Sequence, residues 1–192
     1  MYPIATANPT TGGVTFISIP QTFTHLQLRI FSRSSSGSAG QSIPGSFNSD
    51  GGSNYAYHVL GGDGGSTFSS SAATQTNVYF GWSAGTTNTS NAFSNCIVDI
   101  LDYANTNKYK TVKTLTGIDS NGSGLVGMWS SVWMSTAAIT SILLNPNNFA
   151  TGSTVQLYGI QSSPRTGAYR ERIFTTDLYS NCWFGRCCFY NF

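Results

Sequence analysis

Charged side chains are scarce in this sequence, and their scarcity is the first guide to its function. Of the 192 residues 8% are charged, with nine Lys and Arg against seven Asp and Glu, whereas soluble globular domains usually carry roughly 25%. Serine, threonine, asparagine and glycine are abundant instead, and glycine alone contributes 21 residues. A neutral polar surface of this kind is typical of extracellular β proteins, lectin-like modules and virus particle proteins. It argues against a typical cytosolic enzyme.

Long apolar runs and helical periodicity are also missing. No segment approaches the roughly 20 apolar residues that a membrane-spanning helix needs, so no membrane association is expected. The start of the chain, Met1-Tyr2-Pro3, lacks the basic residues and the following apolar run of a secretory signal peptide. We therefore expect synthesis in a reducing cytoplasm, without export by the general secretory route.

The four cysteines have neither the spacing of a disulfide framework nor that of a zinc site. Cys96 lies in the middle of a predicted strand and is expected to be a buried thiol, while the other three lie near the C-terminus without a CxxC pair. The two histidines, His25 and His58, are too few to complete a metal site. No metal and no other cofactor is predicted.

Basic residues are too few and too dispersed for nucleic-acid binding. In residues 1–163 the five basic and five acidic side chains cancel, so the net charge of +2 comes entirely from residues 164–192. Nucleic acid requires clustered Lys and Arg that displace counterions from the phosphates. A neutral body followed by four arginines is a poor candidate for that role.

Alternation of residues on two faces is the pattern that the chain does have, and it is clearest within residues 95–127. Cys96, Val98 and Ile100 occupy every second position of one run, and residues 108–115 alternate again after an Asn-rich turn. This pattern predicts a central antiparallel hairpin with more antiparallel sheet packed around it. About ten strands are expected, at 14–19, 24–33, 43–47, 55–60, 78–82, 96–101, 108–115, 125–134, 139–144 and 155–160.

Short strands without helical crossovers predict an all-β fold, an antiparallel two-sheet sandwich of jelly-roll type over residues 1–163. The weak strand at 43–47 contains Pro44 and is expected at a sheet edge, because proline cannot donate to a ladder. The stretches 61–74 and 83–91 are rich in small polar residues and are expected to be exposed loops. The chain before residue 14 is expected to be extended.

Residues 164–192 form the second predicted region, a C-terminal extension crowded with aromatic residues. Two interpretations remain open. The extension is either a last strand and loop that cover the same core, or an arm that anchors the protein to a partner or to its own oligomer. We expect the arm, because aromatic residues and Arg dominate interface hot spots. Its predicted interface residues are Tyr169, Arg170, Arg172, Phe174, Tyr179, Trp183, Phe184, Arg186, Phe189, Tyr190 and Phe192.

No pair of acidic residues has the spacing of a catalytic site. Asp99 and Asp102 are the nearest pair, and a separation of three places them on opposite faces of one strand, unlike the converging carboxylates of a glycosidase. The only glutamate, Glu171, lies in the extension. Asp99 is expected instead to pair locally with Lys110 or Lys113. The sequence therefore predicts no enzymatic activity and no catalytic residues.

Two further features have competing interpretations. Residues 119–124 resemble the start of an EF-hand calcium loop, but Ser130 stands where that loop needs a bidentate Glu, so an Asx-turn is expected there. Residues 48–51 are expected to form another. Five aromatic residues in predicted strands are expected in the core, with a sugar-stacking surface as the alternative. They are Tyr55, Tyr57, Trp82, Trp129 and Trp133.

Several longer stretches resemble a known family. They are residues 18–29 (SIPQTFTHLQLR), 99–111 (DILDYANTNKYKT), 47–50 with Asn54 and Tyr55, Trp133 with 139–142 (ITSI), and 157–160 (LYGI). Together, over roughly residues 3–160, they resemble the small β-rich virion proteins of tailed bacteriophages. The resemblance implies a jelly-roll virion component without enzymatic activity, either a capsid decoration (cement) protein or a fibre-like receptor-binding module.

Chains of this family usually stop near residue 160, so residues 164–192 depart from the family pattern and are the candidate anchor. We therefore expect a capsid decoration protein that is located in the virion, binds the major capsid protein or another virion protein, and forms homo-oligomers. The absence of a long fibre shaft favours this interpretation. The alternative is a tail fibre or receptor-binding module that contacts host glycan.

Overall fold

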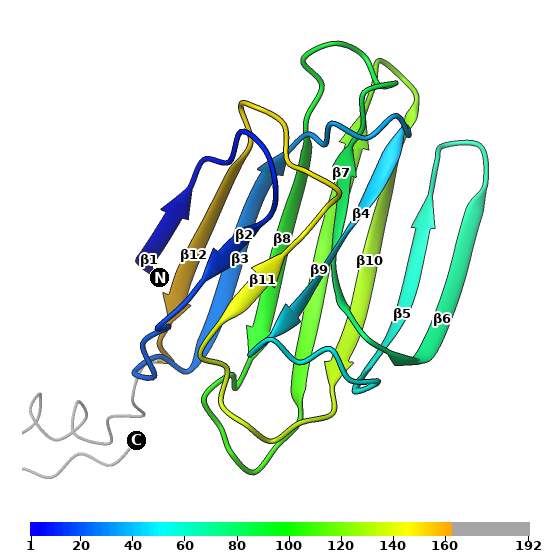
Figure 1. The fold of residues 1–192 in the computed structure, drawn as a ribbon. Coiled ribbons are helices and arrows are strands. Elements are labelled where there is room, and N and C mark those ends of the chain that lie inside the picture. Colours follow the sequence, from blue (N-terminus) through cyan, green and yellow to red (C-terminus); the bar gives the residue numbers. More distant parts are fainter. Residues whose placement is uncertain (163–192) are drawn as a thin grey trace, which may run out of the picture. The chain divides into compact units, whose positions relative to one another are not determined.

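The structure is a computed structural model that describes residues 1–162, which form two antiparallel sheets packed face to face (Figure 1). The larger sheet has the strand order β1-β12-β3-β8-β9-β10-β5-β6 and the smaller sheet the order β2-β11-β4-β7. No helix occurs in this part of the chain. The strands are β1 Tyr2–Ala7, β2 Val14–Phe16, β3 His25–Ser32, β4 Gly40–Phe47, β5 Tyr55–Gly62, β6 Thr67–Gln75, β7 Val78–Ala84, β8 Ser94–Leu101, β9 Lys110–Asp119, β10 Gly124–Trp133, β11 Ile142–Leu144 and β12 Thr154–Ile160.

The predicted central hairpin occupies the middle of the larger sheet. β8 pairs with β9 from Asn95 opposite Gly117 to Leu101 opposite Thr111, and β9 pairs with β10 on its other side. Every second side chain of β8 points toward the smaller sheet, which leaves Val98 fully buried. The prediction of an all-β fold with two antiparallel sheets is confirmed.

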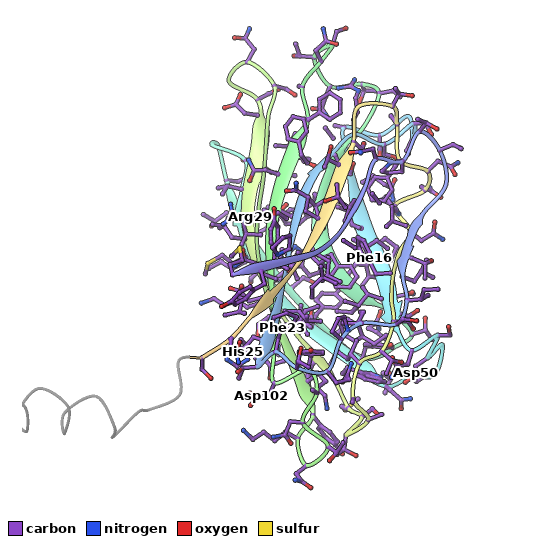
Figure 2. The ribbon with its side chains drawn as sticks, turned by 90° about the vertical axis from the view of Figure 1, so that its left-hand side faces the viewer. Phe16, Phe23, His25, Arg29, Asp50 and Asp102 are labelled. Atoms are coloured by element: carbon purple, nitrogen blue, oxygen red, sulfur yellow. The ribbon has the colours of Figure 1, made fainter. Side chains whose placement is uncertain are left out.

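The hydrophobic core lies between the two sheets, where their inward-facing side chains meet. Leu28 and Leu157 from the larger sheet belong to the same buried cluster as Phe47 and Phe80 from the smaller sheet. Burying a side chain of this size contributes roughly 1.5–3 kcal/mol relative to leaving it exposed. In Figure 2, turned by 90° from Figure 1, side chains fill the space between the two layers.

The loop predicted at 61–74 is wrong, because these residues contain most of strand β6. β6 forms a hairpin with β5, and the turn is closed by Asp63, whose Oδ1 accepts hydrogen bonds from the backbone N–H groups of Gly65 and Ser66 at 2.9 and 2.7 Å. The strand is exposed along almost its whole length. Because no face of β6 is buried, its sequence shows no alternation from which a strand could be predicted.

The edge position predicted for residues 43–47 is also wrong. β4 pairs with β11 on one side and with β7 on the other. Its ladder with β7 shifts register between Ser42 and Pro44, so the proline stands at an irregularity rather than in a regular pair. The N-terminal stretch, predicted only as extended, contains β1, which pairs with β12.

A buried lysine holds the end of the central hairpin. The side chain of Lys110 is fully buried, and its Nζ donates to the carbonyl oxygens of Asn105, Lys108 and Thr136 at 2.7, 2.8 and 3.2 Å. Burial lowers the pKa of Lys110, and the nearby carboxylate of Asp102 opposes this effect. Three acceptors for three ammonium protons explain how a charged group is tolerated there.

Candidate partner-binding surface

The outer face of the larger sheet, turned away from the smaller sheet, carries an ordered set of apolar side chains. Residues that pair directly in an antiparallel ladder point to the same face. The register places Ile97 opposite Leu115, Leu115 opposite Met128, and Met128 opposite Leu60. These four residues, which we call the apolar row, therefore lie side by side across β8, β9, β10 and β5.

The apolar row is exposed to solvent. Its side chains are 36% (Ile97), 49% (Leu115), 49% (Met128) and 57% (Leu60) accessible, and Val126, further along β10 on the same face, is 59% accessible. With neighbouring strands about 4.8 Å apart, the row extends over roughly 14 Å. Single exposed apolar residues are normal on protein surfaces, whereas large contiguous apolar patches are typical of interaction sites.

A polar network lies at one end of the apolar row. Arg29 pairs with Ile97 in the register, and its Nε donates to Oε1 of Gln27 at 3.1 Å. Nε2 of Gln27 donates in turn to Oδ1 of Asp99 at 2.8 Å. Arg29 appears in Figure 2 on the side of the larger sheet opposite Phe16. Between Phe31 and Ile97 this region contains a hollow of about 240 Å³, so the face offers both apolar and hydrogen-bonding contacts.

The two aspartates considered for catalysis belong to separate groups. Asp99 lies on the outer face opposite Lys113, as one of the two predicted pairings requires, whereas Lys110 points inward and the other pairing is wrong. Asp102 follows the end of β8 at a φ of 50°, accepts a hydrogen bond from Lys108 Nζ at 2.8 Å and lies 3.6 Å from His25 Nδ1. The hydrogen bond from Lys108 lowers the pKa of Asp102.

A second candidate site is a cluster of five aromatic rings, most of them partly or fully buried, where β7 lies beside β10 and the β5–β6 hairpin. Trp129 is the centre of this aromatic cluster, with ring centroids 5.0 Å from Tyr57, 5.2 Å from Tyr79 and 5.2 Å from Trp82. Phe68 completes it at 5.9 Å from Trp82 and is 37% exposed. Burial raises the pKa of Tyr79.

The sequence identified three members of the aromatic cluster and missed two. Tyr79 lies on a predicted strand, but nothing in the sequence indicates that its ring contacts the other aromatic rings. Phe68 lies in a stretch that was predicted to be a loop. The other two aromatics named from sequence, Tyr55 and Trp133, are 0% and 2% exposed and belong to the core. Nε1 of Trp133 donates to Oδ2 of Asp50 at 2.7 Å, so neither ring is part of a surface platform.

The Asx-turn predicted at residues 48–51 and the predicted buried thiol are confirmed. Asp50 accepts a hydrogen bond from the backbone N–H of Gly52, two residues further on, at 2.8 Å. In the turn at 119–124, Asp119 accepts instead from the N–H of Gly122, three residues further on, at 3.3 Å, so this turn is not the predicted Asx-turn. Cys96 is 1% exposed, and burial raises its pKa to about 11. Within residues 1–162 no group of three His, Cys, Asp or Glu side chains is placed to hold a metal ion.

The eleven interface residues predicted in the C-terminal extension, from Tyr169 to Phe192, lie outside the described residues. In the part of the chain that the structure covers, no helix has the length and apolar character to cross a membrane. No protein-family model, curated protein or solved structure matches this chain.

Proposed function

We propose that this chain is a bacteriophage virion protein without enzymatic activity, a capsid decoration (cement) protein that binds the major capsid shell. The observation that carries the proposal is the apolar row on the outer face of the larger sheet. Its side chains are exposed in the isolated subunit, and covering them with a partner would remove apolar surface from water. The scarcity of charged residues and the resemblance to virion proteins support the same role.

The outer face is large enough for such a contact. Eight strands at about 4.8 Å and eight residues at about 3.3 Å give a face of roughly 38 by 26 Å. A specific interface of standard size occupies about 800 Å² on each partner. A broad face with apolar side chains at its centre and hydrogen-bonding groups beside them suits a flat shell better than a small ligand.

The path of the chain supports the jelly-roll part of the proposal. Each strand of the smaller sheet, β2, β4, β7 and β11, is preceded and followed along the chain by strands of the larger sheet. The chain therefore crosses repeatedly between two antiparallel sheets, as it does in jelly rolls. In this proposal residues 164–192 provide a second attachment, to the shell or to a sister subunit.

The proposal is tested by adding the purified protein to capsids that lack it and counting bound copies. The full chain is expected to bind in hundreds of copies. The double substitution Leu115→Gln and Met128→Gln, at exposed positions, is expected to reduce affinity at least tenfold, while Thr111→Gln on the same face is a matched control. A full chain that leaves capsids bare would overturn the proposal, and unchanged binding by the double variant would reject the apolar row as the contact.

The extension is tested separately in the same assay. A chain ending at residue 163 is expected to fold, because the core cluster lies within residues 1–162, and to lose capsid binding. A chain of this length that still binds at full occupancy would remove the extension from the proposal and leave the apolar row as the attachment.

The aromatic cluster favours a second candidate function, a tail fibre or receptor-binding module that contacts host glycan. Aromatic rings offer apolar faces on which sugar rings stack, and Phe68 and Trp82 are partly exposed. If this function is correct, the protein binds glycans or host cells, Trp82→Ala weakens that binding, and a particle carries only a handful of copies. Hundreds of copies per particle and an empty glycan array would exclude it.

A further inference from the structure

The larger sheet ends in a strand whose outer edge no described strand covers. β6 pairs only with β5, and in Figure 1 the β5–β6 hairpin lies beyond the smaller sheet. Edge strands present unpaired N–H and C=O groups to any strand that approaches. Natural proteins usually block such edges with proline, charged side chains, bulges or very short strands.

The other three sheet edges each carry a feature that hinders strand addition. β1 contains Pro3 and shifts register between Pro3 and Ala5. β2 is only three residues long. β7 includes Gly81 at a φ of 112°, beside the register shift in its ladder with β4. These are features that discourage pairing with another chain.

β6 lacks these features over most of its length. The nine residues Thr67–Gln75, TFSSSAATQ, include neither proline nor a charged residue. The ladder with β5 is irregular only toward the C-terminal end of β6, opposite Tyr55 to Tyr57, where Thr74 has a φ of 56°. The stretch from Thr67 to Ala72 is therefore regular and almost entirely exposed, and apart from Phe68 its side chains are small.

We propose that β6 pairs antiparallel with β6 of a second copy of this chain across a two-fold axis, which joins two larger sheets into one. Such an axis places a segment opposite itself, so any charge in the segment would meet a like charge. β6 contains Ser, Thr and Ala residues together with Phe68 and Gln75, and because it has no charged residue it is complementary to itself in this sense. The inference concerns the oligomer alone and does not depend on capsid binding.

Side-chain alternation restricts the register of this pairing. Ser69 pairs with Leu60 and shares its outer face, and in a continuous sheet an outward residue must pair with an outward residue. This condition places one residue directly opposite its own copy, with the axis midway between the two. The longest pairing within Thr67 to Ala72 has Ser69 or Ser70 at that position. Because that axis is perpendicular to the sheet, the apolar rows of both copies face the same side, so both could meet one flat surface.

The test is the oligomeric state of the full chain under reducing conditions, measured by sedimentation and native mass spectrometry over a wide concentration range. The wild type is expected to be a dimer. Ser69→Lys and Ser69→Glu, at an exposed position, are each expected to weaken dimerisation at least tenfold, and an equimolar mixture of the two variants is expected to form the mixed dimer. Thr6→Lys, on the opposite edge strand β1, is the matched control and should dimerise like the wild type.

A wild type that stays monomeric at every concentration would overturn the inference, as would a dimer that both charged variants retain. The inference would also be overturned if β6 paired only with a strand of another virion protein. In that case the purified protein would be a monomer, and the β6 amides would be protected from hydrogen exchange only in the assembled particle. Because the oligomeric state is measured without capsids, the absence of a dimer would not count against the proposed shell binding. Likewise, the absence of shell binding would not count against the dimer.

Discussion

On strand β9 the inward-facing side includes Lys110, Thr114 and Thr116, all buried, whereas the outward-facing side carries Leu115, which is 49% exposed. The two faces of the larger sheet thus differ less in polarity than a simple sandwich requires. Part of the interior is polar, and part of the surface is apolar. Position on a strand decides which side chain is buried, and burial alone does not explain the residue types found on the outer face.

The polar groups of the inner face mostly have partners. Oγ1 of Thr116 accepts from the backbone N–H of Trp82 at 3.1 Å and lies 3.2 Å from Sγ of Cys96. A cluster of three buried serine hydroxyls, formed by Ser32, Ser83 and Ser94, is linked at 3.0 Å. The apolar row of the outer face is instead exposed to solvent. The inner face is therefore organised for folding and the outer face, in our proposal, for binding.

Two adjacent residues of β8 should show the largest contrast between the faces. Ile100 is fully buried in the core and Leu101 is 40% exposed on the outer face. Ile100→Ala is expected to lower the free energy of unfolding by about 2–5 kcal/mol through lost burial and a cavity. Leu101→Ala is expected to cost less than about 1 kcal/mol. Urea unfolding measures both, and equal losses would mean that the outer face also stabilises the subunit.

The two lysines of β9 provide the next contrast. Lys110→Met leaves three backbone carbonyl groups without their donor and is expected to lower the free energy of unfolding by about 1–3 kcal/mol. Lys113→Met, on the outer face opposite Asp99, should change it by less than about 0.5 kcal/mol. If Lys110→Met were as stable as wild type, the buried ammonium group would have no net stabilising role.

Acid should weaken the hydrogen bond by which Asp50, in the turn after β4, holds Trp133 of the inner face. Hydrogen bonds from Trp133 first, then Asn54 and Gly52, lower the pKa of Asp50 in the folded protein. The contribution of this carboxylate is present above its unfolded pKa, about 3.9, and is lost as the pH falls through the lower folded value. Asp50→Asn and Trp133→Phe are each expected to reduce the loss of stability between neutral pH and strong acid, measured by urea unfolding. An unchanged pH dependence in both variants would exclude Asp50 as a source of acid sensitivity.

The sequence was sufficient for the fold wherever one face of a strand is buried. The hairpin of β8 and β9 was predicted in the right place because burial imposes alternation on Cys96, Val98 and Ile100. β6 was missed because neither of its faces is buried, so no period could appear. The edge position predicted for residues 43–47 was wrong because a register shift accommodates Pro44 inside the smaller sheet, and alternation in the sequence does not reveal such a shift.

The candidate surfaces were harder to predict than the fold. The apolar row consists of one residue from each of four strands, and only the register brings Ile97, Leu115, Met128 and Leu60 together. Each residue alone reads as an ordinary strand residue. The aromatic cluster was found in part, through Tyr57, Trp82 and Trp129, because aromatic residues stand out in a sequence even when their contacts do not.

The smallest expected effect distinguishes buried polar groups that have partners from those that do not. Thr114 and Thr116 are both 1% exposed on the inner face of β9. Oγ1 of Thr114 has no hydrogen-bond partner within the described residues, in contrast to Oγ1 of Thr116. Thr114→Val removes a hydroxyl that gains nothing from burial, so it is expected to leave the free energy of unfolding unchanged or to raise it by up to about 1 kcal/mol.

Thr116→Val is the matched control for that substitution, because it has the same shape change on the same strand face. It leaves the N–H of Trp82 without its acceptor and is expected to lower the free energy of unfolding by about 1–2 kcal/mol. Urea unfolding of the two variants therefore gives opposite signs if polar residues on the inner face are retained for their hydrogen bonds. A loss for Thr114→Val as large as that for Thr116→Val would show that Thr114 has an acceptor or donor in solution, such as an internal water, and that the inner face is fully satisfied.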